Sequence, residues 1–72
     1  MNRQPVKSSN IASIGYDEEN KTLEVEFHSG AIWQYEPVTQ EGYRAFVNAP
    51  SIGSYFFSFI KNNKTLNATE IE

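Results

Sequence analysis

The sequence predicts an α+β fold in which two short C-terminal helices pack on one face of a three-stranded antiparallel β-meander. Apolar and polar side chains alternate over residues 22–27, which is typical of a strand with one buried face. The connections on both sides of this strand are too short for parallel crossovers, so its neighbours must be antiparallel. A second apolar set recurs at helical spacing, at Ile52, Phe56, Phe59 and Ile60, and is expected to form an inward-facing stripe.

Chain length and composition restrict the possible classes of protein. A chain of 72 residues holds one small domain, and its five Phe, four Tyr and one Trp must supply much of the core. The absence of Cys excludes disulfides, thiolate metal ligands and a cysteine nucleophile. The net charge of −3 excludes a general binder of polyanions, which would need a basic surface.

We predict the three strands at residues 11–16, 22–27 and 31–36. Gly30 allows a positive φ in the hairpin turn at little steric cost, and Pro37 ends the ladder because it lacks an amide donor. Alternate residues of each strand share one face. The residues expected together are Ala12, Ile14 and Tyr16 in the first strand, Leu23, Val25 and Phe27 in the second, and Ala31, Trp33 and Tyr35 in the third.

Two helices are expected after the sheet. Thr39 is a suitable N-cap for the first helix, whose apolar residues are spaced to share one face. A proline breaks the chain after it, and Ser51 can cap the second helix. Because Tyr55, Phe57 and Phe59 cannot all point inward, one or two of these rings must reach the surface.

The ends of the chain are polar and carry no clear pattern. We therefore predict a flexible lead-in at residues 1–8, a single domain at residues 9–62 and a flexible tail at residues 63–72. The N-terminal segment has no apolar run that would make it a secretory signal, and no stretch reaches the roughly 20 apolar residues of a membrane span. These features favour a cytoplasmic protein without a membrane partner.

The residues that could carry catalysis or bind a metal are few. His28 is the only histidine and lies beside the predicted hairpin turn, where it is expected to be solvated. A catalytic role would need partners such as Ser29 and Asp17 in contact with it. One His without Cys leaves only scattered carboxylates as metal ligands. We therefore predict no enzymatic activity, no cofactor and no metal site.

Nucleic-acid binding is one hypothesis for the aromatic residues. Trp33 and Tyr35 share a face of one strand and could each stack a base, although the small size of the domain favours a place in the core. Arg44, Lys61 and Lys64 are the cations available beside them in the helical half.

Two further readings concern the second helix. Ser51 and Gly53 at its start could approach an anion, although an N-cap and close helix packing explain them as well. The exposed rings expected near Tyr55 indicate a surface for a protein partner or for a second copy of the chain.

A series of positions between residues 6 and 61 follows the order of a known domain. They are Val6, Ser8, Ser9 and Ile11; Gly15, Tyr16 and Asp17; Leu23, Val25, Phe27 and Gly30; Trp33, Tyr35, Val38 and Tyr43; Ala49, Ser51, Gly53, Tyr55 and Phe56; and Ile60 and Lys61. This series resembles the KTSC domain, which is named for its occurrence at the C-terminus of some lysyl-tRNA synthetases and also forms small stand-alone bacterial proteins.

The resemblance implies a role in RNA binding. It carries that role to Trp33, Tyr35, Ser51, Gly53, Tyr55 and Lys61. The chain departs from the family pattern twice, because Trp33 replaces a Tyr and Phe57 stands where a polar residue, often Asn, is expected.

We predict a non-enzymatic domain that binds RNA or single-stranded nucleic acid weakly. The alternative is a protein-interaction or homodimerisation module. The predicted binding residues are Trp33, Tyr35, Arg44, Ser51, Gly53, Tyr55 and Lys61.

Overall fold

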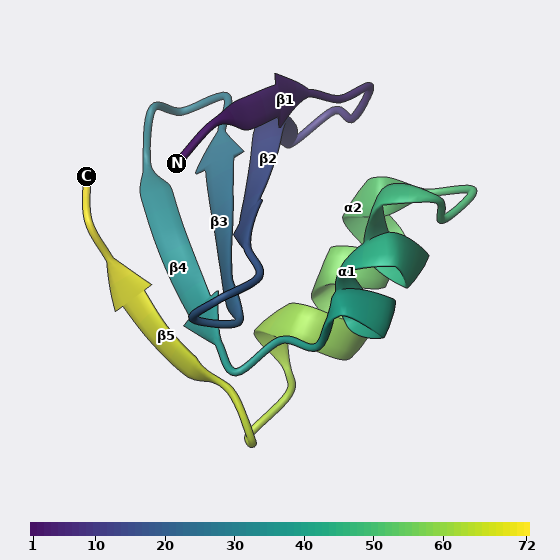
Figure 1. Ribbon diagram of the computed structural model, residues 1–72. Helices are drawn as coiled ribbons and strands as arrows, with labels where there is room; N and C mark the ends of the chain where they lie inside the picture. Colours follow the sequence, from purple (N-terminus) through teal and green to yellow (C-terminus); the bar gives the residue numbers. More distant parts are fainter.

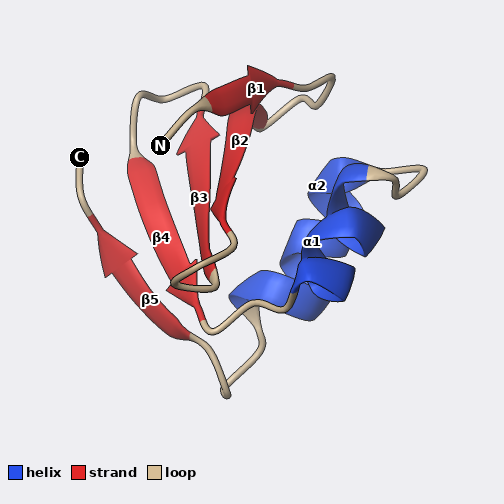
Figure 2. Ribbon diagram, in the orientation of Figure 1, coloured by secondary structure: helices blue, strands red, loops and turns tan.

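Five strands form one antiparallel sheet in which neighbours along the chain are also neighbours in space (Figure 1). The computed structural model describes residues 1–72. The strands are β1 (Arg3–Pro5), β2 (Ile11–Asp17), β3 (Thr22–Phe27), β4 (Ile32–Glu36) and β5 (Asn67–Glu70). The helices are α1 (Gln40–Val47), α2 (Ile52–Tyr55) and the π-helix η1 (Phe56–Lys61), which continues α2. They lie together on one side of the sheet (Figure 2), so the predicted α+β class is confirmed.

The sheet has five strands, so the predicted number of three is wrong. Strand β1 pairs with β2 and strand β5 pairs with β4, which makes them the two edges of the sheet. They lie in residues 1–8 and 63–72, for which the sequence suggests flexible segments. Most of their side chains are exposed on both faces, so their pairing depends on backbone hydrogen bonds and leaves no alternation in the sequence.

The register of the central strands directs one set of side chains toward the helices. Val25 lies opposite Ile14 on β2 and Trp33 on β4, and Leu23 lies opposite Tyr35. Since paired residues share a face of the sheet, Trp33 and Tyr35 both face the helices. Tyr35 is buried and Trp33 is half-buried. The buried core consists of Ile11, Ile14, Leu23, Val25, Tyr35, Val38, Phe46, Phe56 and Ile60.

Two local backbone features adjust the predicted hairpins. A β-bulge shifts the register of β2 between Ile11 and Ser13, so that Ile11 is fully buried. Ala12, which is expected on one side of the strand with Ile14 and Tyr16, lies at this bulge and is half-buried. Gly30 has a φ of 97° in the β3–β4 turn, as predicted.

Both helices begin at the predicted caps. Thr39 Oγ1 accepts a hydrogen bond from the Gly42 amide at 3.0 Å. Ser51 Oγ accepts one from the Ser54 amide at 3.3 Å. Helix α1 then directs Phe46, which is fully buried, into the centre of the core.

The second helix changes geometry at Phe56, where the π-helix η1 begins. Hydrogen bonds from residue i to i+5 widen each turn, so the side chains rotate relative to a regular α-helix. Phe56 and Ile60 remain buried, whereas Phe59 is 60% exposed. The prediction of Phe59 as part of the buried stripe is therefore wrong. None of the helices has the length and hydrophobicity that crossing a membrane requires.

A polar network covers the face of the sheet opposite the helices. Arg3 donates a hydrogen bond and forms an ion pair with Glu24, and Gln34 Nε2 donates to Glu24 at 2.9 Å. Burial would raise the pKa of Glu24, but the hydrogen bonds from Gln34 and Arg3 and the charge of Arg3 lower it overall. Gly15 permits the close approach of β1, because a Cβ there would lie 2.9 Å from the Asn2 carbonyl oxygen.

Candidate nucleic-acid interface

A groove runs along the helix formed by α2 and η1, on the side that faces the sheet and the loop before β2. It consists of three clefts that share walls, which we name the serine, histidine and tryptophan clefts and together the α2–η1 groove. Gly53 and Phe57 line both the serine and the histidine clefts. Phe56 and Lys61 line both the histidine and the tryptophan clefts. The groove is therefore continuous along one side of the helix.

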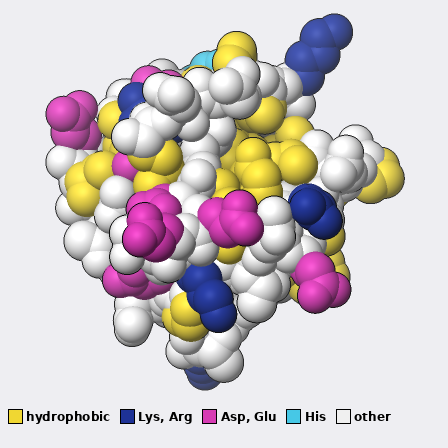
Figure 3. Space-filling view, in the orientation of Figure 1, with side chains coloured by type: hydrophobic (Ala, Val, Ile, Leu, Met, Phe, Trp, Pro, Cys, Tyr) yellow, Lys and Arg dark blue, Asp and Glu magenta, His cyan; other side chains and the backbone are white.

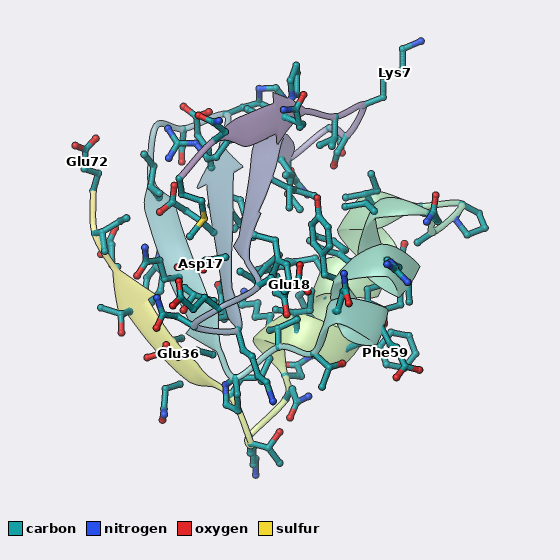
Figure 4. The ribbon with its side chains drawn as sticks, in the orientation of Figure 1. Lys7, Asp17, Glu18, Glu36, Phe59 and Glu72 are labelled. Atoms are coloured by element: carbon teal, nitrogen blue, oxygen red, sulfur yellow. The ribbon has the colours of Figure 1, made fainter.

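The serine cleft has a volume of about 510 Å³ and is lined mostly by hydroxyl and amide groups. These groups belong to Ser8, Ser9, Asn10, Ser51, Ser54 and Ser58. Gly53 allows the helix to approach the loop before β2, because a Cβ there would lie 3.5 Å from Ser8 Oγ. Lys7 lines the same cleft, and its side chain extends away from the body of the molecule (Figure 4). The cleft thus offers several hydrogen-bonding groups and one cation, Lys7, on a long side chain.

The histidine cleft, of about 410 Å³, combines aromatic rings with the imidazole of His28 and the amino group of Lys61. His28 is exposed, and its Nε2 lies 3.0 Å from the Ser8 carbonyl oxygen, which joins the β3–β4 turn to the loop before β2. Lys61 Nζ lies 5.2 Å from the centre of the Phe57 ring, within the range of a cation–π interaction. Phe57 is 57% exposed, so this ring and its cation both face solvent.

The tryptophan cleft, of about 300 Å³, is lined by Phe27, Trp33, Tyr35, Phe56, Lys61 and Ala68. Trp33 and Tyr35 stack with ring centres 6.4 Å apart and planes 22° apart. Phe56 meets Tyr35 edge to face at 5.5 Å and Phe27 at 5.3 Å. Burial raises the pKa of Tyr35 above the ordinary value of a tyrosine.

Charge is distributed unevenly over the molecule. None of the residues lining the three clefts is Asp or Glu, whereas Lys7, His28 and Lys61 all line them. In the view of Figure 3, hydrophobic side chains gather between the sheet and the helices, and acidic ones gather near the β2–β3 turn. Asp17 and Glu18 lie at this turn (Figure 4). The groove is therefore suited to an anionic ligand despite the net charge of −3.

Residues 7–63 match the model of the KTSC domain. The chain belongs to the KTSC domain family. An uncharacterised protein from Stutzerimonas stutzeri (strain A1501) is 44% identical over 61 residues, which are 85% of this chain and 86% of that protein. The crystal structure of a KTSC domain protein from Yersinia pestis has a TM-score of 0.92 and 38% identity to this chain. The match covers 99% of this chain and 97% of that one.

The KTSC domain is also similar to a segment of lysine–tRNA ligases. The ligase of Nostoc punctiforme is 36% identical over 55 residues, and that of Nostoc sp. (strain PCC 7120) is 40% identical over 55 residues. Each match covers 76% of this chain but 10% of the ligase. The similarity therefore concerns one small part of those enzymes.

The KTSC structure brings five of the seven predicted binding residues to the groove. Trp33, Tyr35 and Lys61 line the tryptophan cleft, and Ser51 and Gly53 line the serine cleft.

The other two predicted residues lie elsewhere. Arg44 is exposed on α1 and lines none of the three clefts. Tyr55 is half-buried and stacks on Phe46 with ring centres 5.6 Å apart, so its ring belongs to the packing between the two helices. Their placement follows from the angle at which the helices pack, which neighbouring sequence does not specify.

Sequence reasoning missed Lys7, His28 and Phe57 as members of this surface. His28 and Lys7 come from segments that only the folded chain brings near the helix. A signal existed for Phe57, because Gly53, Phe57 and Lys61 are spaced four residues apart and such residues share a helix face.

Proposed function

We propose that this KTSC domain binds RNA or another single-stranded nucleic acid weakly along the α2–η1 groove, and that it catalyses no reaction. The observation that carries the proposal is the composition of the groove. Cations and exposed rings lie side by side there, with no carboxylate among the lining residues. Proteins that hold single strands combine these two features, because cations follow the phosphates while rings stack the bases.

Each cleft suits a different part of a nucleotide chain. Lys7 and Lys61 supply positive charge for phosphates at separate points along the groove. The serine cleft supplies hydroxyl and amide groups for sugar and phosphate oxygens. Phe57 and Trp33 present rings on which bases could stack. Such contacts depend little on sequence, so weak affinity and low sequence preference are expected.

The relatives add a second line of support. The similar proteins include three lysine–tRNA ligases, enzymes whose name gives a tRNA as what they act on. The stand-alone relative from Stutzerimonas stutzeri shows that a chain of similar length also exists apart from any ligase. We therefore propose that RNA binding is a property of the domain itself.

The test is a titration of isotope-labelled protein with tRNA and short oligonucleotides at low and moderate salt, followed through amide chemical shifts. We expect shifts to concentrate at residues of the groove, such as Ser9, Gly53 and Phe57. Lys61→Ala should weaken binding several-fold, because it removes the cation shared by two clefts.

The matched controls are Lys64→Ala and Arg44→Ala, which remove exposed cations that line none of the three clefts. Both should leave the affinity unchanged. The absence of any shift at the lowest salt, or equal losses in all three variants, would contradict the proposal.

Self-association or protein binding is a second candidate function, favoured by Phe59. Its ring is 60% exposed and lies 4.8 Å from the Tyr55 ring, measured between centres. A shallow cleft beside them is lined partly by Val38, Ile60 and Leu66 and contains no charged residue. Chemical shifts of this region that change with protein concentration alone, and are lost in Phe59→Ala, would support this function.

A further inference from the structure

The tryptophan cleft differs from the rest of the groove in its walls. Strand β4 contributes Trp33 and Tyr35, and the helix contributes Phe56 and Lys61. On β5, Ala68 lies opposite Tyr35 in the register. Because Ala68 carries only a methyl group, the space beside the Tyr35 ring stays open. The result is a small apolar cleft of about 300 Å³ with aromatic sides.

The lining of this cleft and the sheet register beside it supply two charged groups of opposite sign. Lys61 of η1 lines both this cleft and the neighbouring histidine cleft. Glu70 on β5 is the register partner of Trp33. Its side chain therefore leaves the same face of the sheet, with the two Cβ atoms roughly 5 Å apart. A ligand lying on the indole would have the Lys61 cation on the side of η1 and the Glu70 carboxylate on the side of β5.

We propose that the tryptophan cleft binds one unpaired nucleotide whose base carries an exocyclic amino group, a proposal that rests on the nucleic-acid binding argued above. The base stacks on the indole of Trp33, the phosphate pairs with the Lys61 ammonium, and the amino group donates a hydrogen bond to the Glu70 carboxylate. Each part matches a known preference, because bases stack on aromatic rings and carboxylates accept from the amino group of cytosine.

The charges favour this occupant over a peptide or a lipid tail. An apolar side chain or tail would use the rings but would leave Lys61 without a counter-charge. A free anion would use Lys61 but not the apolar walls. A nucleotide combines a flat apolar body, an anionic end and a hydrogen-bond donor on the opposite edge.

The experiment uses the intrinsic fluorescence of the protein, because Trp33 is the only tryptophan in the chain. The probes are CMP, UMP and cytidine, with free tryptophan amide as the control for light absorbed by the nucleotide. CMP and UMP differ at the amino group, and CMP and cytidine differ at the phosphate. We expect saturable quenching by CMP, with affinity roughly tenfold or more lower for UMP because one hydrogen bond to a charged group is lost.

Three variants assign the parts of the site. Ala68→Leu should abolish CMP binding by filling the cleft from an exposed edge strand. Lys61→Ala should remove the difference between CMP and cytidine, and Glu70→Ala should remove the difference between CMP and UMP. Lys64→Ala is the matched control and should change none of these affinities.

Unsaturable quenching, or CMP binding that survives Ala68→Leu, would overturn the placement in this cleft. Equal affinities for CMP and UMP in the unmodified protein would overturn the role of Glu70. If mononucleotides fail while oligonucleotides still shift groove amides, this inference falls and the proposed function stands. If both fail, both fall together.

Discussion

The two faces of the β-sheet carry opposite kinds of side chain, and β3 contributes to both. Leu23 and Val25 are fully buried beneath the helices, whereas Glu24 and Glu26 project to the other face. The outer face holds its carboxylates in a network with Arg3. The helix-side face holds the core and, along its rim, the α2–η1 groove.

This difference explains how an acidic protein can present a surface for anions. The alternation of a strand sends neighbouring side chains to opposite faces, so the sheet itself separates Glu24 and Glu26 from the groove. Salt screens charges beyond about 8 Å at physiological ionic strength, and the molecule measures 22 Å along its shortest axis. Net charge is therefore a poor guide to the potential within the groove.

The largest expected effect concerns the helix-side face, where Phe46 is fully buried. Phe46→Ala should lower the free energy of unfolding by about 3–5 kcal/mol, because it leaves a large cavity. A domain of this size has a total stability of only about 3–5 kcal/mol, so the variant should be largely unfolded. Thermal denaturation followed by circular dichroism measures this. The control is Phe59→Ala, at an exposed position, which should unfold at nearly the same temperature as the unmodified protein. Equal losses of stability in the two variants would contradict the packing of Phe46.

A smaller loss is expected on the outer face from Arg3→Ala. Glu24 is 5% exposed, and losing its partner should lower the free energy of unfolding by about 1–3 kcal/mol at neutral pH. The pKa of Glu24 is lowered in the folded protein, so its ionised form stabilises the fold above the usual pKa of Glu. That stabilisation is lost as the pH falls through the lowered pKa.

Denaturant unfolding across the acid range should therefore show the Arg3→Ala deficit shrinking as the pH decreases. Glu24→Gln should flatten the same acid-dependent part of the stability curve. A deficit in Arg3→Ala that stays constant from neutral to acidic pH would mean that the ion pair with Glu24 is not its cause.

The next comparison is between two rings of the same helix that are exposed to a similar degree, Phe57 at 57% and Phe59 at 60%. Phe57 lies under Lys61 in the groove, whereas Phe59 contacts Tyr55 on another side. Phe57→Ala should weaken oligonucleotide binding by about 1 kcal/mol through lost stacking, and Phe59→Ala should have no effect. Fluorescence anisotropy of a labelled oligonucleotide measures the affinity of both variants. A larger loss of affinity in Phe59→Ala than in Phe57→Ala would place the interface on the Phe59 side of the helix.

The smallest expected effect is on the salt dependence of binding. Each phosphate contact with a single strand contributes roughly −0.7 to the slope of log affinity against log salt concentration. Contacts from Lys7 and Lys61 predict a slope of about −1.4, and Lys7→Ala should reduce it to about −0.7. Lys64→Ala should leave the slope unchanged. A slope near zero in the unmodified protein would exclude phosphate contacts altogether.

The candidate site was predictable where its residues follow from local pattern. Trp33 and Tyr35 share a face by strand alternation, and Ser51 and Gly53 mark the start of a helix. Arg44 was chosen by charge alone, and the structure places it on the exposed surface of α1 instead. Charge in a sequence does not show which side of a helix packs toward a groove.

The sequence by itself determined the central strands, the helix caps and the membership of most of the core. These depend on alternation, helical spacing and capping, which act between residues a few positions apart. Only the tertiary structure decided the edge strands β1 and β5, the outward turn of Phe59 in η1 and the assembly of Lys7, His28 and Lys61 along one groove. Backbone pairing at exposed edges and the packing of a helix against distant loops leave no periodic mark, because they depend on which segments meet in space.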